Sequence, residues 1–217
     1  MMKSKFIFMW CFIAIGILAA QDSSWLTMSI PGVCSLKIPP TLEIQSGTYK
    51  ELGEKLQNLI IPESDTSNRV IAQPKGINQF DLNSLESYSR VILNFHKGKP
   101  GDYLSKGTPV DITNEELKEI DKLYKNEFIN EIKTQNNSSY KISLVEWFPI
   151  RIVSIQDYPV ILISYIRTAN DNSSVLVRMY NIHNDDKFIT LDLSYRISES
   201  EIWKNDFDRI INTIKIY

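Results

Sequence analysis

Alternation of apolar and polar residues marks the C-terminal part of the chain as strands. Between residues 189 and 197, isoleucine, leucine and tyrosine occupy every second position, and polar residues such as Asp192 stand between them. A period of two with one polar face is typical of an antiparallel strand that is covered on one side. The short polar side chains of Asn184-Asp185-Asp186 predict a turn just before it. Val175–Ile182 is therefore the expected other arm of a hairpin.

Six further segments have the length and the β-branched or aromatic content of strands. Val160–Ile166 is apolar at nearly every position, which indicates a strand buried on both faces. Asp157-Tyr158-Pro159 is expected to turn it back onto the segment before it. The other predicted strands are Leu26–Ile30, Val33–Ile38, Arg69–Ala72, Tyr88–Phe95 and Ile142–Ile155.

Three segments begin with the capping-box pattern, in which a hydroxyl residue precedes a glutamate by three positions. Behind each box, apolar residues recur at spacings of three, four and seven, and charged residues occupy the opposite face. These segments are therefore predicted to be amphipathic helices that cover a sheet. The boxes are Thr48 with Glu51, Thr113 with Glu116, and Ser198 with Glu201.

The order of the elements predicts the fold class. Strands joined by tight turns pair antiparallel, and a strand buried on both faces needs a layer on each side. We expect an α+β fold, an α/β/α sandwich around a mostly antiparallel sheet. No linker, repeat or low-complexity tract divides residues 21–217, which are predicted to form a single domain.

The N-terminus has the layout of a secretory signal peptide. Lys3 and Lys5 precede an uncharged apolar run, Phe6–Leu18, and small residues follow it. This order predicts cleavage between Ala20 and Gln21 and export to the periplasm or the exterior. The alternative is a single membrane anchor, but the run is shorter than the about 20 apolar residues that a span needs. We expect no stable membrane span after residues 1–20 are removed.

Charge restricts the partners. Loss of Lys3 and Lys5 leaves 22 basic against 26 acidic residues, a formal net charge of −4. Nucleic-acid binding rests on neutralising phosphates with basic side chains, and anionic membranes attract basic clusters. Neither a nucleic acid nor an anionic membrane surface is therefore expected as a partner of this mildly acidic chain, which has no basic cluster.

Candidate chemistry is sparse. Cys34 alternates with apolar residues in a predicted strand, which favours a buried, inert side chain over a reactive thiol. His96 shares its face with Arg90 and Asn94 and is expected to be solvated. A metal site could be drawn from His183, Asp185 and Asp186, but it lacks the ligand spacing of zinc or calcium sites.

Aromatic residues surround one acidic residue. Glu146 lies beside Trp147 and Phe148, where a carboxyl group could have a raised pKa and act as an acid. The favoured interpretation places Glu146 on the solvent side of a strand. Trp147, Phe148 and Tyr158 could line a groove, although core packing is the favoured role. No catalytic, cofactor-binding or metal-ligating residue is therefore assigned, and no cofactor is expected.

Three stretches resemble the PsbP-like fold, which is shared with the Ran-binding Mog proteins. Ile30-Pro31 followed by Val33–Pro39 is similar to that family's opening hairpin, and Val70–Gly76 is similar to a strand and turn in exported bacterial relatives. Leu191–Tyr195 followed by Trp203–Ile214 resembles its closing strand and helix. The resemblance implies an accessory, non-enzymatic role beside a larger assembly.

Three functions remain open at this stage. The first is an exported, non-catalytic binding or accessory domain with an extracytoplasmic protein partner. The second is a carrier of a small or lipidic ligand, and the third is a hydrolase that uses carboxylates such as Glu146. The oligomeric state stays open.

Overall fold

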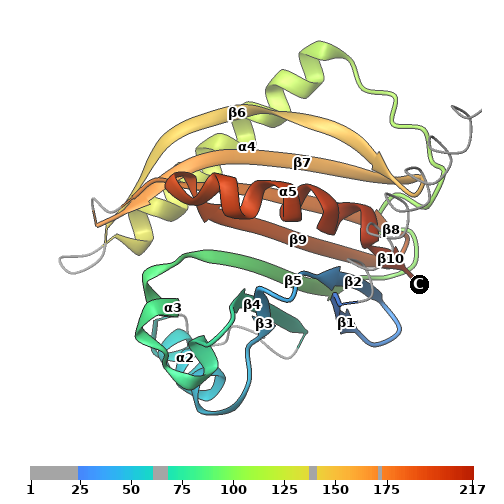
Figure 1. Ribbon diagram of the computed structural model, residues 1–217. Coiled ribbons are helices and arrows are strands. Elements are labelled where there is room, and N and C mark those ends of the chain that lie inside the picture. Colours follow the sequence, from blue (N-terminus) through green and yellow to red (C-terminus); the bar gives the residue numbers. More distant parts are fainter. Residues whose placement is uncertain (1–23, 61–67, 137–140, 171–172) are drawn as a thin grey trace, which may run out of the picture.

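A computed structural model gives the fold (Figure 1), and it describes residues 24–60, 68–136, 141–170 and 173–217. The predicted signal peptide, residues 1–20, and the cleavage site between Ala20 and Gln21 lie outside the described residues. Helices and antiparallel strands are mixed along the rest of the chain, so the predicted α+β class is confirmed. Within the described ranges, no helix is both long and apolar enough to cross a membrane.

A seven-stranded sheet forms the centre of the molecule. Its strand order is β3-β4-β5-β9-β8-β7-β6, and all neighbouring pairs are antiparallel. The predicted strands are confirmed, and β9 lies in the middle. Only β3 was not predicted, because three residues are too few to show alternation. The bounds are β3 Leu42–Ile44, β4 Arg69–Pro74, β5 Ser89–Lys97, β6 Ile142–Ile155, β7 Tyr158–Ala169, β8 Val175–Asn184 and β9 Lys187–Arg196.

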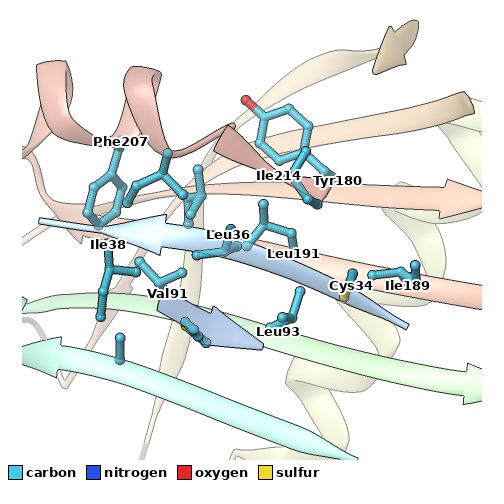
Figure 2. Packing of buried hydrophobic residues seen from close by; sticks show 14 of the residues in the cluster. Cys34, Leu36, Ile38, Val91, Leu93, Tyr180, Ile189, Leu191, Phe207 and Ile214 are labelled. Atoms are coloured by element: carbon cyan, nitrogen blue, oxygen red, sulfur yellow. The ribbon is translucent and has the colours of Figure 1, made fainter. Parts of the chain in front are cut away.

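One face of this sheet is covered by helix α5 (Ser200–Ile210) and a second, small sheet. The small sheet has the order β1-β2-β10, with bounds β1 Leu26–Ile30, β2 Cys34–Ile38 and β10 Lys215–Ile216, so the predicted opening hairpin is confirmed. Figure 2 shows side chains of β2, β5, β9 and α5 meeting in one core. The labelled core residues include Leu36, Val91, Leu191 and Phe207, and the last of these is completely buried.

The opposite face is covered by helix α4 (Asn114–Gln135), which packs against β6 and a second apolar cluster. The predicted capping box begins this helix: the Glu116 amide donates to Thr113 Oγ1 at 3.2 Å, and the Thr113 amide donates to Glu116 Oε2 at 2.8 Å. With helices on both faces of the central sheet, the predicted α/β/α sandwich is confirmed.

The other two boxes differ from the prediction. Helix α2 (Gly47–Ile60) begins one residue before Thr48. Helix α5 has Glu199, not Ser198, at its N-cap, because a 3₁₀ turn, η2 (Ile197–Glu199), comes directly before it. The Glu199 carboxylate instead accepts hydrogen bonds from Trp203 Nε1 at 2.9 Å and from Ser87 Oγ.

Besides η2, two short helical segments were not predicted, since one turn or little more is too short to show a helical period. They are η1 Ile77–Gln79 and α3 Leu82–Glu86. The last turn of the predicted helix Trp203–Ile214 is a separate 3₁₀ turn, η3 Ile211–Thr213, directly after α5.

Candidate functional site

The central sheet is hollowed where it meets α4. Successive side chains of a strand point to opposite faces, so Tyr165 of β7 and Asn181 of β8 project toward α4. Two cavities, of about 280 and 140 Å³, lie between these strands and the helix. Because they share four lining side chains, we treat them as one site, the α4 groove. The shared residues are Phe128, Glu131, Tyr165 and Met179.

Aromatic rings form one wall of the α4 groove. The Phe128 and Tyr165 ring centroids are 4.3 Å apart, and Trp147 stacks on Tyr165 at 6.0 Å with 7° between the ring planes. Trp147 Nε1 donates to Asp121 Oδ1 at 2.9 Å, and the same oxygen accepts the Ile150 amide at 2.9 Å. The Asp121 carboxylate therefore ties α4 to β6 and fixes the orientation of the Trp147 ring.

Two polar side chains lie at the floor of the groove. Asn181 is only 4 % exposed, and its Oδ1 has no hydrogen-bond partner among the described residues. The same holds for the buried Oδ1 of Asp192. Asp192 is opposite Met179 in the ladder and Asn181 is opposite Thr190, so the two are diagonal neighbours on β8 and β9. A buried acceptor left without a donor costs about 1–3 kcal/mol, so the floor favours a donor from outside the chain.

Charge is distributed unevenly around this floor. Burial raises the pKa of Asp192 to about 6, although the positive charge of Arg69 acts in the opposite direction. Glu131, exposed at the mouth of the groove, accepts a hydrogen bond from Gln135 Nε2 at 2.8 Å. Arg167 also lines the larger cavity and donates to the Tyr88 hydroxyl at 3.2 Å. The larger cavity is thus lined by two carboxyl groups, those of Glu131 and Asp192, and by the guanidinium of Arg167.

Cys34 and Glu146 occupy the positions favoured by the sequence. Cys34 is completely buried in the core on the α5 side, and burial raises the pKa of its thiol to about 11. It is therefore a protonated core residue at neutral pH. Glu146 is exposed on β6 and is not among the residues that line the α4 groove.

The histidines have no shared site. His183 packs its ring edge-on against Tyr103 at 5.8 Å and Phe188 at 5.4 Å, and burial lowers its pKa. Asp185 Oδ1 accepts a hydrogen bond from the Gly101 amide at 3.1 Å. The β8–β9 turn therefore holds the loop between β5 and α4, residues 98–113. His96 is exposed at the end of β5, as predicted. Among the described residues, no three His, Cys, Asp or Glu side chains are placed to hold a metal ion.

The three aromatic residues that could line one groove are separated by the fold. Trp147 joins the wall of the α4 groove, and Phe148, the next residue of the strand, projects to the other face. Tyr158 is buried in the core on the α5 side, with Lys106 Nζ 5.2 Å from its ring centroid. Core packing is thus confirmed for Tyr158, while Trp147 lies at a boundary between core and cavity.

Asn181 and Asp192 were missed by the sequence interpretation. Alternation placed Asp192 on the polar face of its strand, and such a face normally contacts water. Asp192 could have been identified by combining two predictions: it lies on the polar face of its strand, and a long amphipathic helix must cover part of the same sheet.

Comparisons with known proteins show similarity of fold. No protein-family profile and no curated protein matches the chain. The chain is similar to the cyanobacterial PsbP protein (CyanoP) of Synechocystis sp. PCC 6803, with 14 % identity over 89 % of this chain and 93 % of that one, and a TM-score of 0.48. Stretches of the sequence resemble the PsbP-like fold, and a solved PsbP protein is among the structures to which this chain is similar.

Two further solved structures are similar. One is a protein of Bacteroides thetaiotaomicron, with 8 % identity, 89 % of this chain covered and a TM-score of 0.45. This chain spans about half the length of that protein, 49 %. The other is a Pseudomonas aeruginosa protein of unknown function, with 9 % identity over 87 % of this chain and 94 % of that one, and a TM-score of 0.34.

Proposed function

We propose that this protein is an exported, non-catalytic binding domain that holds a small ligand in the α4 groove. The observation that carries the proposal is a pair of buried oxygens, Asn181 Oδ1 and Asp192 Oδ1, which have no hydrogen-bond partner among the described residues and lie beneath a wall of aromatic rings. A concave, largely apolar site with a few convergent polar groups is the usual form of a ligand site.

Export and the absence of catalysis belong to the same proposal. The charged start, apolar run and small residues of positions 1–20 support secretion to the periplasm or the exterior. The described residues that line the groove include no serine, cysteine or histidine, so none of these nucleophiles or bases is supplied by that part of the chain. The extracytoplasmic protein partner implied by the PsbP-like resemblance would receive or sense the ligand.

One observation favours a second candidate, a hydrolase. Asp192 and Glu131 line the same cavity of about 280 Å³, and the pKa of Asp192 is raised to about 6. Glycoside hydrolases use two carboxyl groups, one of which has a raised pKa and acts as the acid. Glu146 has no part in this candidate, because it lies outside the groove.

A groove-filling substitution tests the proposal. Met179 lines both cavities, so Met179→Trp is expected to fill them, while Leu123→Trp on the exposed side of α4 leaves them open. Each protein is purified without refolding from its own host and analysed by native mass spectrometry. We expect a bound small molecule on the wild type and on Leu123→Trp, and none on Met179→Trp.

Two outcomes would contradict the binding proposal. One is an equal ligand mass on all three proteins, which would place the ligand elsewhere. The other is no ligand on any of them, together with no change in melting temperature in a host extract. Turnover of a glycoside that is lost in both Asp192→Asn and Glu131→Gln would instead favour the hydrolase.

A further inference from the structure

The unpaired groups of the α4 groove are acceptors. Asn181 Oδ1 and the carboxylate oxygen Asp192 Oδ1 both lack a donor among the described residues. Glu131 lines both cavities, and Glu127 lines the smaller one. Among the described residues that line the two cavities, Arg167 is the one cationic side chain, and it already donates a hydrogen bond to the Tyr88 hydroxyl. A ligand that supplies donors and a positive charge complements this set.

The walls of the groove suit the same kind of ligand. Phe128, Trp147 and Tyr165 form a ring cluster, with centroid separations of 4.3 to 6.0 Å. Aromatic faces attract cations through the ring quadrupole, and they also cover hydrocarbon. A group with a charged end and an apolar body can therefore satisfy both the floor and the wall.

We propose that the α4 groove binds a small organic cation through a primary ammonium group. An ammonium has three donors and no acceptor, and two of the donors would reach Asn181 Oδ1 and Asp192 Oδ1. The hydrocarbon part would lie against Phe128, Tyr165 and Met179. This inference rests on the proposed function, since it names the ligand class of the same groove.

Other ligand classes fit less well. Calcium takes six to eight oxygen ligands, whereas the walls here are rings and a thioether. An anion would face the carboxylates of Asp192, Glu127 and Glu131. Among the described residues that line the two cavities only Arg167 is cationic, and the positive charge of Arg69 already acts on Asp192. The cavity volumes, about 280 and 140 Å³, are below or at the lower end of those that hold drug-sized molecules, so the ligand is small. The ammonium could belong to a simple amine or to an amino acid whose carboxylate meets Arg167.

The charge state of Asp192 gives the binding a pH dependence. The charged and titratable groups that face it are Arg69 of β4, Tyr165 and Arg167 of β7, and Glu131 of α4. A bound cation favours the ionised carboxylate, so affinity is full above the pKa of about 6 and falls as the pH drops through it.

Matched probes test the ligand class. Benzylamine, benzyl alcohol and benzoate have one ring and differ in charge, so their affinities are compared by NMR titration of the isotope-labelled protein. We expect benzylammonium to bind about tenfold or more tightly than benzyl alcohol, since hydrogen bonds to charged groups are the stronger ones. Asp192→Asn should remove this preference, and Glu119→Gln, on an exposed position of the same helix outside the groove, should retain it.

Phenylalanine and phenethylamine distinguish the two sources of the ammonium. Tighter binding of phenylalanine, lost in Arg167→Met, identifies an amino acid, and tighter binding of phenethylamine identifies a simple amine. The inference is overturned if benzyl alcohol or benzoate binds as well as benzylamine, or if the host ligand that Met179→Trp releases has no amine. In both cases the proposed binding function stands. If neither probes nor host material bind the groove, both proposals fail.

Discussion

The ionised carboxylate of Asp192 has a higher free energy in the folded protein than in the unfolded chain. Burial raises its pKa from 3.8 to about 6, so the folded protein binds this proton more readily than the unfolded chain does. The ionised side chain therefore destabilises the fold above about pH 6, and that cost disappears as the pH falls toward the unfolded pKa. A destabilising residue that lines a cavity is expected where function needs its charge.

Replacing Asp192 tests this cost directly. In the ligand-free protein, Asp192→Asn should raise the free energy of unfolding at about pH 8 by as much as about 3 kcal/mol, the equivalent of the pKa shift. The gain should shrink toward zero at about pH 4, where Asp192 is neutral in the wild type. Denaturant titrations of both proteins across this pH range measure the gain in the free energy of unfolding. Because His183 titrates in both proteins, the difference between their free energies isolates the contribution of Asp192. A gain that does not vary with pH would show that Asp192 is solvated.

Two helices show how far a local pattern determines an element. The boxes at Thr113 and Ser198 each pair a hydroxyl residue with a glutamate three positions later, yet only the first box forms. At the second, Glu199 binds Trp203 and Ser87, and Ser87 is 112 residues away in the sequence. The presence of each helix could thus be predicted from its apolar stripe, while the residue at which α5 begins depends on a contact that no local pattern contains.

The same pair of boxes makes a matched experiment. Thr113→Ala should lower the free energy of unfolding by about 1 kcal/mol, because it removes the acceptor of the Glu116 amide. Ser198→Ala should change it by less than about 0.5 kcal/mol, as is usual for a surface substitution. Both are measured by urea denaturation monitored by circular dichroism. Equal losses from the two variants would mean that the Thr113 cap contributes nothing of its own.

At the scale of the whole molecule, the layers could be predicted from the sequence but the groove could not. Alternation assigns Asp192 and Asn181 each to one face of a strand. That the two are diagonal neighbours depends on the register of β8 with β9, and that a cavity lies above them depends on where α4 crosses the sheet. Both are set by pairings between distant residues, which strand and helix periods do not encode.

The two apolar cores use alternate residues of the same strands. Tyr165 and Val177 pack on the α4 side, while Leu162 and Tyr180 pack on the α5 side. Loss of either core removes support from strands that the other core needs, so the sandwich should unfold as one cooperative unit.

Tryptophan fluorescence can follow each side separately. Trp147 lies on the α4 side, and Trp25 and Trp203 lie in the other core. We expect the fluorescence of Trp147→Phe, and that of the double variant Trp25→Phe/Trp203→Phe, each to change at the same denaturant concentration as the circular dichroism of that variant. A fluorescence transition that comes earlier only in the double variant would mean that α4 separates from the sheet first. Ligand entry to the groove would then proceed through local opening of this helix rather than through a preformed mouth.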